Sequence, residues 1–342
     1  MGKRGVLLIN VGTPDEPTIP SVKKYLKEFL LDPDVIDIPA PLRHLLVRGI
    51  ILRVRPKKIA PLYQKIWMDE GSPLRVYSSR ITTSLNEMFD DTEFEFSMRY
   101  GNPSINAGLA NLRAAGVDEL LLLPMFPHYA QATTESSLKH AHKQLAAMNW
   151  APSLLEMQHF ETEEEYTTPL ANSIQPHIDK DTHLLFSYHG LPISHVKRID
   201  KSKKHCQKVD DCCSIKCDAN QLCYAHHCME TTLSVVAKLG LEIDEWSLSY
   251  QSRLGPVKWL EPSTVNKVEE LVKRGVKKLA IVAPAFLADG LETLEELDIG
   301  IREHFFELGG KELTVIGCLN DNSEWIKGLG ALIDKTFQPA SA

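Results

Sequence analysis

The stretches LLINVGTP (residues 7–14) and LLFSYHGLP (residues 184–192) share one plan: a short apolar run, polar residues, then a glycine and a proline. Two further pairs follow in the same order: FEFSMRYGNP (94–103) with WSLSYQSRLGP (246–256), and GVDELLLLPMF (116–126) with GVKKLAIVAPAF (275–286). The offset within each pair is roughly 150–180 residues. Chance similarity between buried strands is one explanation, but three pairs in the same order favour an internal repeat and predict two similar halves.

The apolar runs are short and nearly continuous, which is typical of strands buried on both faces of a parallel sheet. Helical patterns such as SVKKYLKEFLL and METTLSVVAKLG lie between them. Alternating strands and helices predict an α/β fold with parallel sheets. We therefore expect two Rossmann-like α/β halves, residues 1–170 and 171–342, each a parallel sheet flanked by helices. A cleft between them near the carboxyl ends of the strands would bind the ligand.

Composition limits the classes of partner. The chain has 342 residues, a formal charge of −7 and no basic block of the kind that binds nucleic acid, so we expect no nucleic-acid partner. No run approaches the roughly 20 apolar residues of a membrane span, and the N-terminus lacks the pattern of a signal peptide. We therefore expect a cytoplasmic protein with reduced thiols. The stretch LLVRGIILRVRPKK (45–58) is either a helix with a solvated basic face or a peripheral contact with membrane lipid or an anionic ligand. The sequence does not indicate an oligomeric state.

Two groups of chemically active residues follow strands of the second half. His189 ends the strand in FSYHGLP, where an imidazole can accept a proton or bind a metal. A carboxylate row follows the strand KLAIVAPAF, with Glu292, Glu296 and Asp298 as its members. On a helix, Glu292 and Glu296 share a face. The row is either an acidic helix N-terminus, which the helix dipole favours, or a track for divalent cations or protons.

Common catalytic motifs are missing from the sequence. No Walker A loop occurs, and no G-x-G-x-x-G follows the first strand, which argues against nucleotide-dependent chemistry. The G-x-S-x-G elbow of α/β-hydrolases is absent as well.

Across nearly the whole chain, the motifs LLINVGTPD, MRYGNPS, PHYAQATT, FSYHGLP, SYQSRLGPVKWLEPST and FLADGLETLEELD appear in an order that resembles the ferrochelatases. The resemblance implies two Rossmann-like halves around a porphyrin cleft. It also implies insertion of Fe(II) into protoporphyrin IX with release of two protons, the last step of haem synthesis. Two alternatives stay open: coproporphyrin III as the substrate, or a two-lobed protein that binds a tetrapyrrole or metal without turning it over.

Carried over residue by residue, the resemblance makes His189 and Glu292 the catalytic, metal-handling pair. Glu296 and Asp298 would continue the acidic track. The macrocycle contacts would fall on four residues, Ser72, Arg75, Tyr129 and Trp259.

Six of the seven cysteines lie within residues 205–228, in a polar segment with spacing C-x5-C-C-x3-C-x5-C-x4-C. This spacing matches neither paired C-x2-C zinc ribbons nor plant-type ferredoxins. The segment at about 205–224 resembles the cysteine-rich insertion that holds a [2Fe-2S] cluster in some bacterial ferrochelatases. Zinc, free thiols and disulfides are the alternatives. We expect four ligands: Cys206, Cys213, Cys223 and Cys228. Cys212 and Cys217 are the reserves, because adjacent cysteines such as Cys212 and Cys213 rarely bind one centre together.

Overall fold

The computed structural model describes residues 2–253, 255 and 257–338. Contacts within the chain divide it into two compact units. Unit 1 comprises the chain up to Phe126, Gln131–His159 and the chain from Gly330 onward, and unit 2 comprises Pro127–Ala130 and Phe160–Leu329. The boundary expected near residue 170 falls inside helix α7 (Glu164–Ile174), which belongs whole to unit 2. The division at residue 170 stays a prediction.

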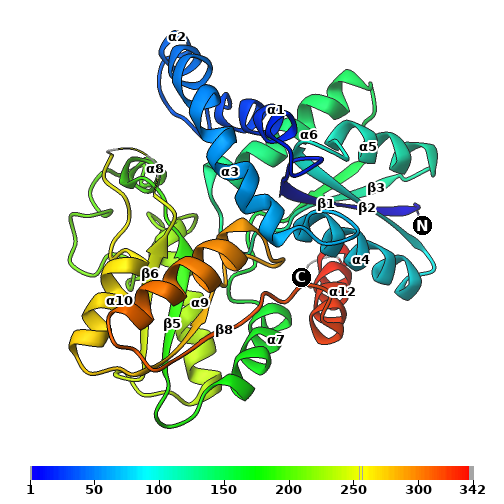
Figure 1. The fold of residues 1–342 in the computed structure, drawn as a ribbon. Coiled ribbons are helices and arrows are strands. Elements are labelled where there is room, and N and C mark those ends of the chain that lie inside the picture. Colours follow the sequence, from blue (N-terminus) through cyan, green and yellow to red (C-terminus); the bar gives the residue numbers. More distant parts are fainter. Residues whose placement is uncertain (1, 254, 256, 339–342) are drawn as a thin grey trace. The chain divides into compact units, whose positions relative to one another are not determined.

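Unit 1 is built on a four-stranded parallel sheet in the order β2-β1-β3-β4 (Figure 1). Its strands are β1 (Arg4–Gly12), β2 (Thr92–Tyr100), β3 (Glu119–Pro124) and β4 (Ser153–Glu156). Its helices are α1 (Ile19–Leu30), α2 (Ala40–His44), η1 (Leu45–Ile51), α3 (Leu52–Ile66), α4 (Pro73–Met88), α5 (Ile105–Ala114), η2 (Gln131–Glu135) and α6 (Ser136–Ala147). Side chains alternate between the two faces of a strand. Leu7 and Ile9 of β1 accordingly share one core with α5 and α6.

Unit 2 repeats this plan with a parallel sheet in the order β6-β5-β7-β8. Its strands are β5 (His183–His189), β6 (Trp246–Gln251), β7 (Lys278–Val282) and β8 (Glu312–Val315). Its helices are α7, η3 (Gln175–His177), α8 (Ile193–Ile199), α9 (Tyr224–Leu239), α10 (Thr264–Lys273), η4 (Glu292–Ile301), α11 (Arg302–Glu307) and the first part of α12 (Ser323–Phe337). Strand for strand, the two orders are equivalent, so the expected α/β fold with two similar halves is confirmed.

Several helices begin where the sequence supplies a hydroxyl to cap them. The side chains of Thr18, Ser72, Ser104 and Ser263 each accept a hydrogen bond from a backbone N–H in the first turn of the helix that follows. Such caps satisfy donors that have no partner inside the helix. Helix α9 ends at Gly240, whose φ of 67° is left-handed and suits glycine.

The two faces of the unit 2 sheet have different coverings. Leu185 of β5 packs in a core formed with α10, η4 and α11. The next face-sharing residue, Ser187, contacts Thr264 of α10 at 2.8 Å. On the opposite face, the Tyr188 hydroxyl lies 2.8 Å from that of Thr232 on α9. Alternation along β5 therefore directs His189 to the α10 and η4 side, and Tyr188 to the α9 side.

Candidate active site

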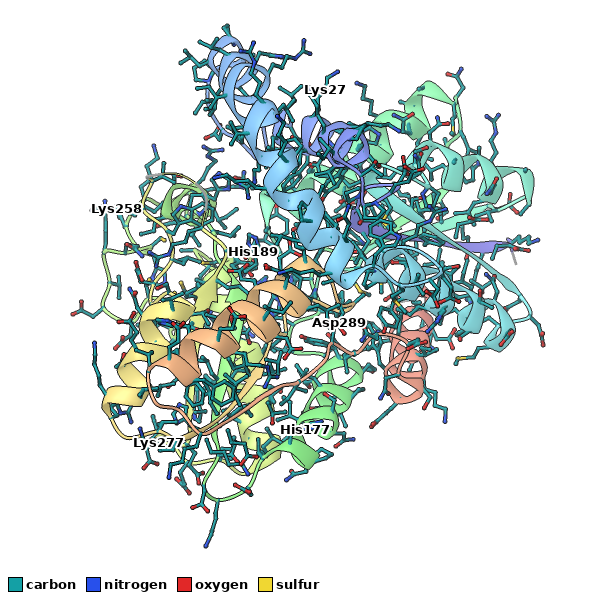
Figure 2. The ribbon with its side chains drawn as sticks, viewed as in Figure 1. Lys27, His177, His189, Lys258, Lys277 and Asp289 are labelled. Carbon is teal, nitrogen blue, oxygen red and sulfur yellow. The ribbon has the colours of Figure 1, made fainter. Side chains whose placement is uncertain are left out.

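His189 is the last residue of β5, at the carboxyl end of the unit 2 sheet, and is half-buried (Figure 2). Its ring Nδ1 lies 2.7 Å from the Gly190 carbonyl oxygen. A carbonyl can only accept, so Nδ1 carries a proton, and in the neutral ring Nε2 is the nitrogen with the free lone pair. This arrangement is usual for histidines that bind a metal or accept a proton, because it fixes both the tautomer and the ring. The Phe286 ring lies edge-on to the imidazole, with 6.2 Å between centroids.

The main chain around His189 is held by two further contacts. The Tyr224 hydroxyl, in the first turn of α9, donates to the His189 carbonyl oxygen at 2.9 Å. Gly190 N–H donates to the Gln251 carbonyl oxygen at 2.6 Å, and a Cβ added to Gly190 would lie 2.7 Å from that oxygen. A van der Waals contact needs more room, so only glycine fits beside the end of β6. The Gly-Leu-Pro that follows His189 is thus part of how the imidazole is positioned.

Gln251 links the end of β5 to the start of η4. It is 3% exposed and pairs with His189 in the parallel register of β5 and β6. Its Oε1 accepts a hydrogen bond from the Ser187 hydroxyl at 2.8 Å, and its Nε2 donates to the Glu292 carbonyl oxygen at 2.7 Å. The bond from Ser187 is buried and the bond to Glu292 is partly buried, and an unmade bond in such surroundings is costly. The backbone that carries Glu292 is therefore tied to the strand ends that carry His189.

The acidic row lies on η4, which is a π-helix along its whole length from Glu292 to Ile301. The sequence led us to expect ordinary helical i,i+4 spacing. Hydrogen bonding from i to i+5 widens each turn, and such turns are frequent at functional sites. Asp289, just before η4, is buried (6% exposed) and accepts hydrogen bonds from the Thr293 hydroxyl at 2.8 Å and the Asn320 amide at 2.6 Å (Figure 2). These bonds anchor the start of η4.

The members of the row differ in their partners. Glu296 accepts hydrogen bonds from the Ser252 backbone N–H, at 2.8 Å, and from the Ser252 hydroxyl. Asp298 forms an ion pair with Arg302, one turn further along. Arg302 therefore pairs with the carboxylate at the far end of the row.

The four expected porphyrin contacts fall on different parts of the fold. Trp259 lies in unit 2 on a segment that pairs with Pro192, and its ring would lie 3.4 Å from a Cβ on Gly190. Its indole N–H is buried without a hydrogen-bond partner among the described residues. Tyr129 belongs to the short Pro127–Ala130 segment of unit 2 and is 7% exposed. Ser72 caps α4 in unit 1, with Arg75 three residues on.

Unit 2 thus brings together His189, the row on η4, and Trp259. Ser72 and Arg75 belong to the other unit. Sequence analysis missed the roles of three residues: Gln251, Tyr224 and Asp289. For Gln251 a signal was present, because an amide at the end of a buried strand must find partners for both of its ends. For Tyr224 and Asp289 the partners are backbone carbonyls and distant side chains, which no local pattern reveals.

All six clustered cysteines are free thiols. Residues 201–222 form successive turns with no long regular element, and the Asp200 carboxylate accepts from the backbone N–H groups of His205 and Cys206, at 2.9 and 3.0 Å. Burial, followed by the nearby thiols of Cys223 and Cys212, raises the pKa of Cys206 to about 11. Burial, then Cys212 and Cys223, raises the pKa of Cys213 as well. The sulfur atoms of Cys212 and Cys213 lie 4.0 Å apart.

The other two cysteines have distinct surroundings. Cys228 is completely buried on α9, and burial raises its pKa well above the usual range. Cys223 and Cys213 raise that pKa further. The Cys217 sulfur lies 3.7 Å from the His205 ring. The expected ligand set, Cys206, Cys213, Cys223 and Cys228, stays a prediction.

The amphipathic stretch of residues 45–58 forms η1 and the first part of α3, and α2 directly precedes it. Its exposed apolar side chains are Leu42, Leu45, Ile50 and Val54, with exposed fractions of 56%, 68%, 61% and 51%. Basic residues from Arg48 to Lys58 are interspersed among them. Within the described residues, no helix combines the length and the apolar character needed to cross a membrane.

The chain is similar to several known proteins. The family model "Ferrochelatase" matches residues 3–337. Proteins named ferrochelatase from Pseudomonas fluorescens (strain Pf0-1) and Stutzerimonas stutzeri (strain A1501) are 40% and 39% identical, over 98% and 99% of both chains. The solved structure of SirB from Bacillus subtilis with Fe3+ is similar in fold, with a TM-score of 0.55 at 11% identity, covering 98% of this chain and 95% of that one.

Proposed function

The chain belongs to the ferrochelatase family, and from this membership we propose that it inserts Fe(II) into protoporphyrin IX to form protohaem. The macrocycle gives up two pyrrole N–H protons, its four nitrogens bind the iron, and no electron is transferred. The observation that best supports this proposal is the tautomer of His189. Because Nδ1–H is committed to the Gly190 carbonyl, Nε2 is the basic atom at the carboxyl end of the sheet. A protein that only bound porphyrin would not need a positioned proton acceptor.

In this proposal, His189 accepts pyrrole protons through Nε2 or holds the incoming iron. Glu292, tied by its backbone to Gln251, is its partner. Glu296 passes protons or cations to and from Glu292, and Asp298, paired with Arg302, forms the outer end of the track. Trp259 and Tyr129 contact the macrocycle from unit 2, and Ser72 and Arg75 contact it from unit 1. The partnerless indole N–H of Trp259 is a donor suited to a ligand acceptor.

The test is anaerobic mixing of the purified protein with Fe(II) and protoporphyrin IX, followed by visible spectroscopy, with a parallel reaction containing coproporphyrin III. We expect catalytic formation of protohaem, with coproporphyrin turned over more slowly. Faster turnover of coproporphyrin would identify it as the substrate. Binding of both porphyrins without turnover would indicate a tetrapyrrole-binding protein.

We also propose that the cysteine segment holds a [2Fe-2S] cluster. A cluster of this type needs four thiolates, and the segment offers that donor set in one neighbourhood. The segment has no extensive apolar core of its own, since it consists of turns anchored by Asp200 and Asn220. Bound metal would stabilise the folded segment, as an apolar core does elsewhere in the protein. Once bound, the cluster would supply a covalent staple and a one-electron centre. Iron insertion itself needs no electron, so the cluster would not take part in that step.

Our candidates for the four ligands are Cys206, Cys213, Cys223 and Cys228, and Cys212 is the rival of Cys228. The matched pair Cys212→Ser and Cys228→Ser separates them. We expect Cys228→Ser to abolish the visible absorption of the purified protein and Cys212→Ser to retain it. The reverse result would replace Cys228 by Cys212. Stoichiometric zinc in place of iron and sulfide in the wild-type protein would exclude the cluster.

Finally, we propose a cytoplasmic protein that contacts the membrane surface through α2, η1 and α3. Leucine and isoleucine side chains flanked by arginines and lysines suit an anionic lipid surface, and the apolar product would leave into that surface. Sedimentation with vesicles containing anionic lipid, compared with neutral vesicles, tests this. We expect binding to the anionic vesicles alone, and loss of that binding in a Leu45→Ser/Ile50→Ser variant. Equal recovery of variant and wild type would contradict it.

A further inference from the structure

Helix α9 joins the cysteine segment to the Pro127–Ala130 segment inside unit 2. Cys223 stands at its N-terminal cap, so the cysteine segment runs directly into its first turn. His227 and Thr231 lie one turn apart on the helix and therefore share a face. This face contacts residues 127–130. The helix thus connects a segment proposed to hold metal with one proposed to contact porphyrin.

His227 is bonded at both ring nitrogens and is 1% exposed. Its Nδ1 accepts a hydrogen bond from the backbone N–H of Tyr129 at 3.2 Å. Its Nε2 lies 2.7 Å from the Gln221 carbonyl oxygen and must donate to it, because a carbonyl only accepts. The ring is therefore the neutral Nε2–H tautomer. One imidazole spans from the cysteine segment to the main chain of Tyr129.

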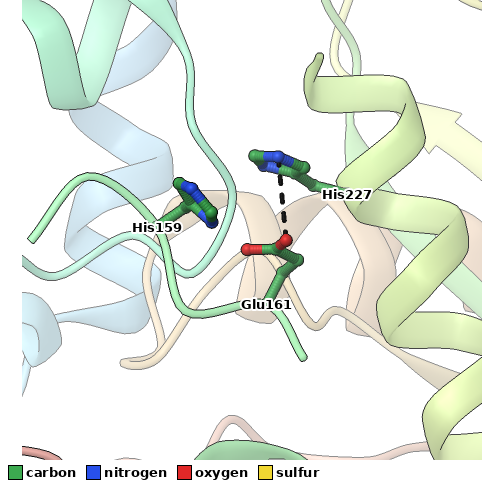
Figure 3. A group of neighbouring side chains, drawn as sticks. All are labelled: His159, Glu161 and His227. Atoms are coloured by element: carbon green, nitrogen blue, oxygen red, sulfur yellow. Dashed lines mark ion pairs between the residues drawn. The ribbon is translucent and has the colours of Figure 1, made fainter. Parts of the chain in front are cut away.

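The neighbouring Glu161 does not make this position a metal site. Glu161 is buried, and one of its carboxylate oxygens lies 3.7 Å from Nε2 of His227 (Figure 3). A metal would need a lone pair from the ring, but Nδ1 spends its lone pair on Tyr129 and Nε2 carries a proton. The structural role of the ring explains its burial without a metal.

A second contact holds the same segment and gives it a defined place. His128 Nε2 lies 2.8 Å from the Thr231 hydroxyl, and that hydroxyl donates to the Glu161 carbonyl oxygen at 2.9 Å. Thr231 must then accept from His128. The His128 ring also lies edge-on to Tyr188 and Tyr224, at centroid distances of 5.2 and 5.9 Å. The side chain of His128 thus helps to fix where the segment lies, and the His227 ring connects the segment's backbone to the cysteine segment.

We infer that His227 is a positioning residue that transmits the order of the cysteine segment to Tyr129. When the cysteine segment is fixed, the Gln221 carbonyl fixes the ring, and the ring fixes the Tyr129 N–H. When the segment loosens, Tyr129 loses its anchor and porphyrin binding weakens. The inference rests on the proposed function, because it takes Tyr129 to contact porphyrin.

Two substitutions of His227 each keep one of its two hydrogen bonds and remove the other. In His227→Gln the amide nitrogen can reach the Gln221 carbonyl as Nε2 does, but nothing accepts from Tyr129. In His227→Asn the amide oxygen can take the place of Nδ1 and accept from Tyr129, but nothing reaches Gln221. His226→Asn is the matched control on the next residue. The His226 ring contacts the Cys213 carbonyl, at 2.6 Å, rather than residues 127–130.

The experiment is a double-mutant cycle between Cys206→Ser and each histidine variant in the full chain. One readout is the dissociation constant for protoporphyrin IX from its fluorescence, without iron. The other is the hydrogen-exchange rate of the peptide that contains residues 127–130. When two sites are coupled, a change at one site typically alters the affinity at the other by at least about fivefold. We expect Cys206→Ser to weaken porphyrin binding by about that factor and to speed exchange in the wild-type and His226→Asn backgrounds. In the His227→Gln and His227→Asn backgrounds, Cys206→Ser should cause almost no further change in the dissociation constant or in the exchange rate.

An equal effect of Cys206→Ser in all four backgrounds would overturn the inference, as would unchanged exchange of residues 127–130 in Cys206→Ser. If His227→Gln fails to fold, the cycle is completed with His227→Asn, which interrupts the same path at its other bond. Failure of the wild-type protein to bind protoporphyrin would instead refute the proposed function, and the exchange data would still decide whether the two segments are coupled.

Discussion

Gln251 offers the sharpest test of how the site is held together. The substitution Gln251→Leu removes two hydrogen bonds, the buried one from Ser187 and the partly buried one to the Glu292 carbonyl. The Ser187 hydroxyl can still bond to Thr264, which lies 2.8 Å away, but the Glu292 carbonyl loses this donor. A neutral bond contributes about 1 kcal/mol, and a buried group left unsatisfied costs about 1–3 kcal/mol. Because the Glu292 carbonyl is only partly buried, we expect the unfolding free energy to fall by about 2 kcal/mol, measured by urea denaturation.

The effect on activity should exceed the effect on substrate binding. The start of η4 is no longer tied to the end of β6, and a displacement of about 1 Å can lower a rate about 100-fold. We expect kcat for anaerobic iron insertion to fall about 10- to 100-fold, while the protoporphyrin dissociation constant changes less than about threefold.

Ser187→Ala is the matched control, because it removes the bond to Oε1 of Gln251 and leaves the bond from Nε2 to Glu292. We expect it to cost about 1 kcal/mol of stability and to leave kcat within about twofold of wild type. Wild-type kcat in Gln251→Leu, or equal losses of kcat in both variants, would refute the claim that Gln251 positions Glu292.

Four further outcomes follow from the structure. Tyr224→Phe removes the donor to the His189 carbonyl and should lower kcat about tenfold at unchanged porphyrin affinity; an unchanged kcat would contradict the positioning of His189 by α9. Gly190→Ala forces a methyl against the Gln251 carbonyl and should cost about 1–3 kcal/mol in thermal or urea unfolding; a variant as stable as wild type would show that the backbone yields there. Asp32→Asn removes the negative charge that pairs with Arg99, so we expect the free energy of unfolding to fall by about 3–5 kcal/mol. A fall of less than about 1 kcal/mol would contradict this. Burial, aided by the charge of Arg274, lowers the pKa of His183 to about 4. Between about pH 6.5 and 4 the unfolded chain therefore binds a proton at this residue that the folded protein does not bind. The free energy of unfolding should fall as the pH is lowered through that window, and His183→Gln should make this pH dependence less steep.

The strand pattern of the sequence was enough to predict much of the fold. LLINVGTP and LLFSYHGLP lie in β1 and β5, the strands that pair with two neighbours each at equivalent places in their sheets. This succeeded because strands buried on both faces must be apolar throughout, and the signal is local. His189 and Glu292 were placed at the carboxyl edge for the same reason. Each follows a buried strand closely, and parallel strands end at one edge.

Features that depend on distant partners could not be predicted. The π-helical form of η4 has no local signature, because the sequence from Glu292 to Asp298 fits ordinary helical spacing equally well. The ion pair of Asp298 with Arg302 is local, but it lies beyond the acidic run that attracted attention. The arrangement of the thiols follows from turns held by Asp200 and Asn220, and the segment lacks the apolar periodicity on which sequence-based prediction depends.

We propose that His189, whose Nε2 has the free lone pair in the neutral ring, removes protons from the porphyrin or delivers the iron. The most direct measurement compares His189→Ala with wild type under anaerobic conditions, recording protoporphyrin binding by fluorescence and haem formation by absorbance. We predict that the variant binds protoporphyrin within about threefold of wild type and forms haem at a rate lower by at least about 100-fold, because it lacks the general base. Haem formation at the wild-type rate would contradict the claim.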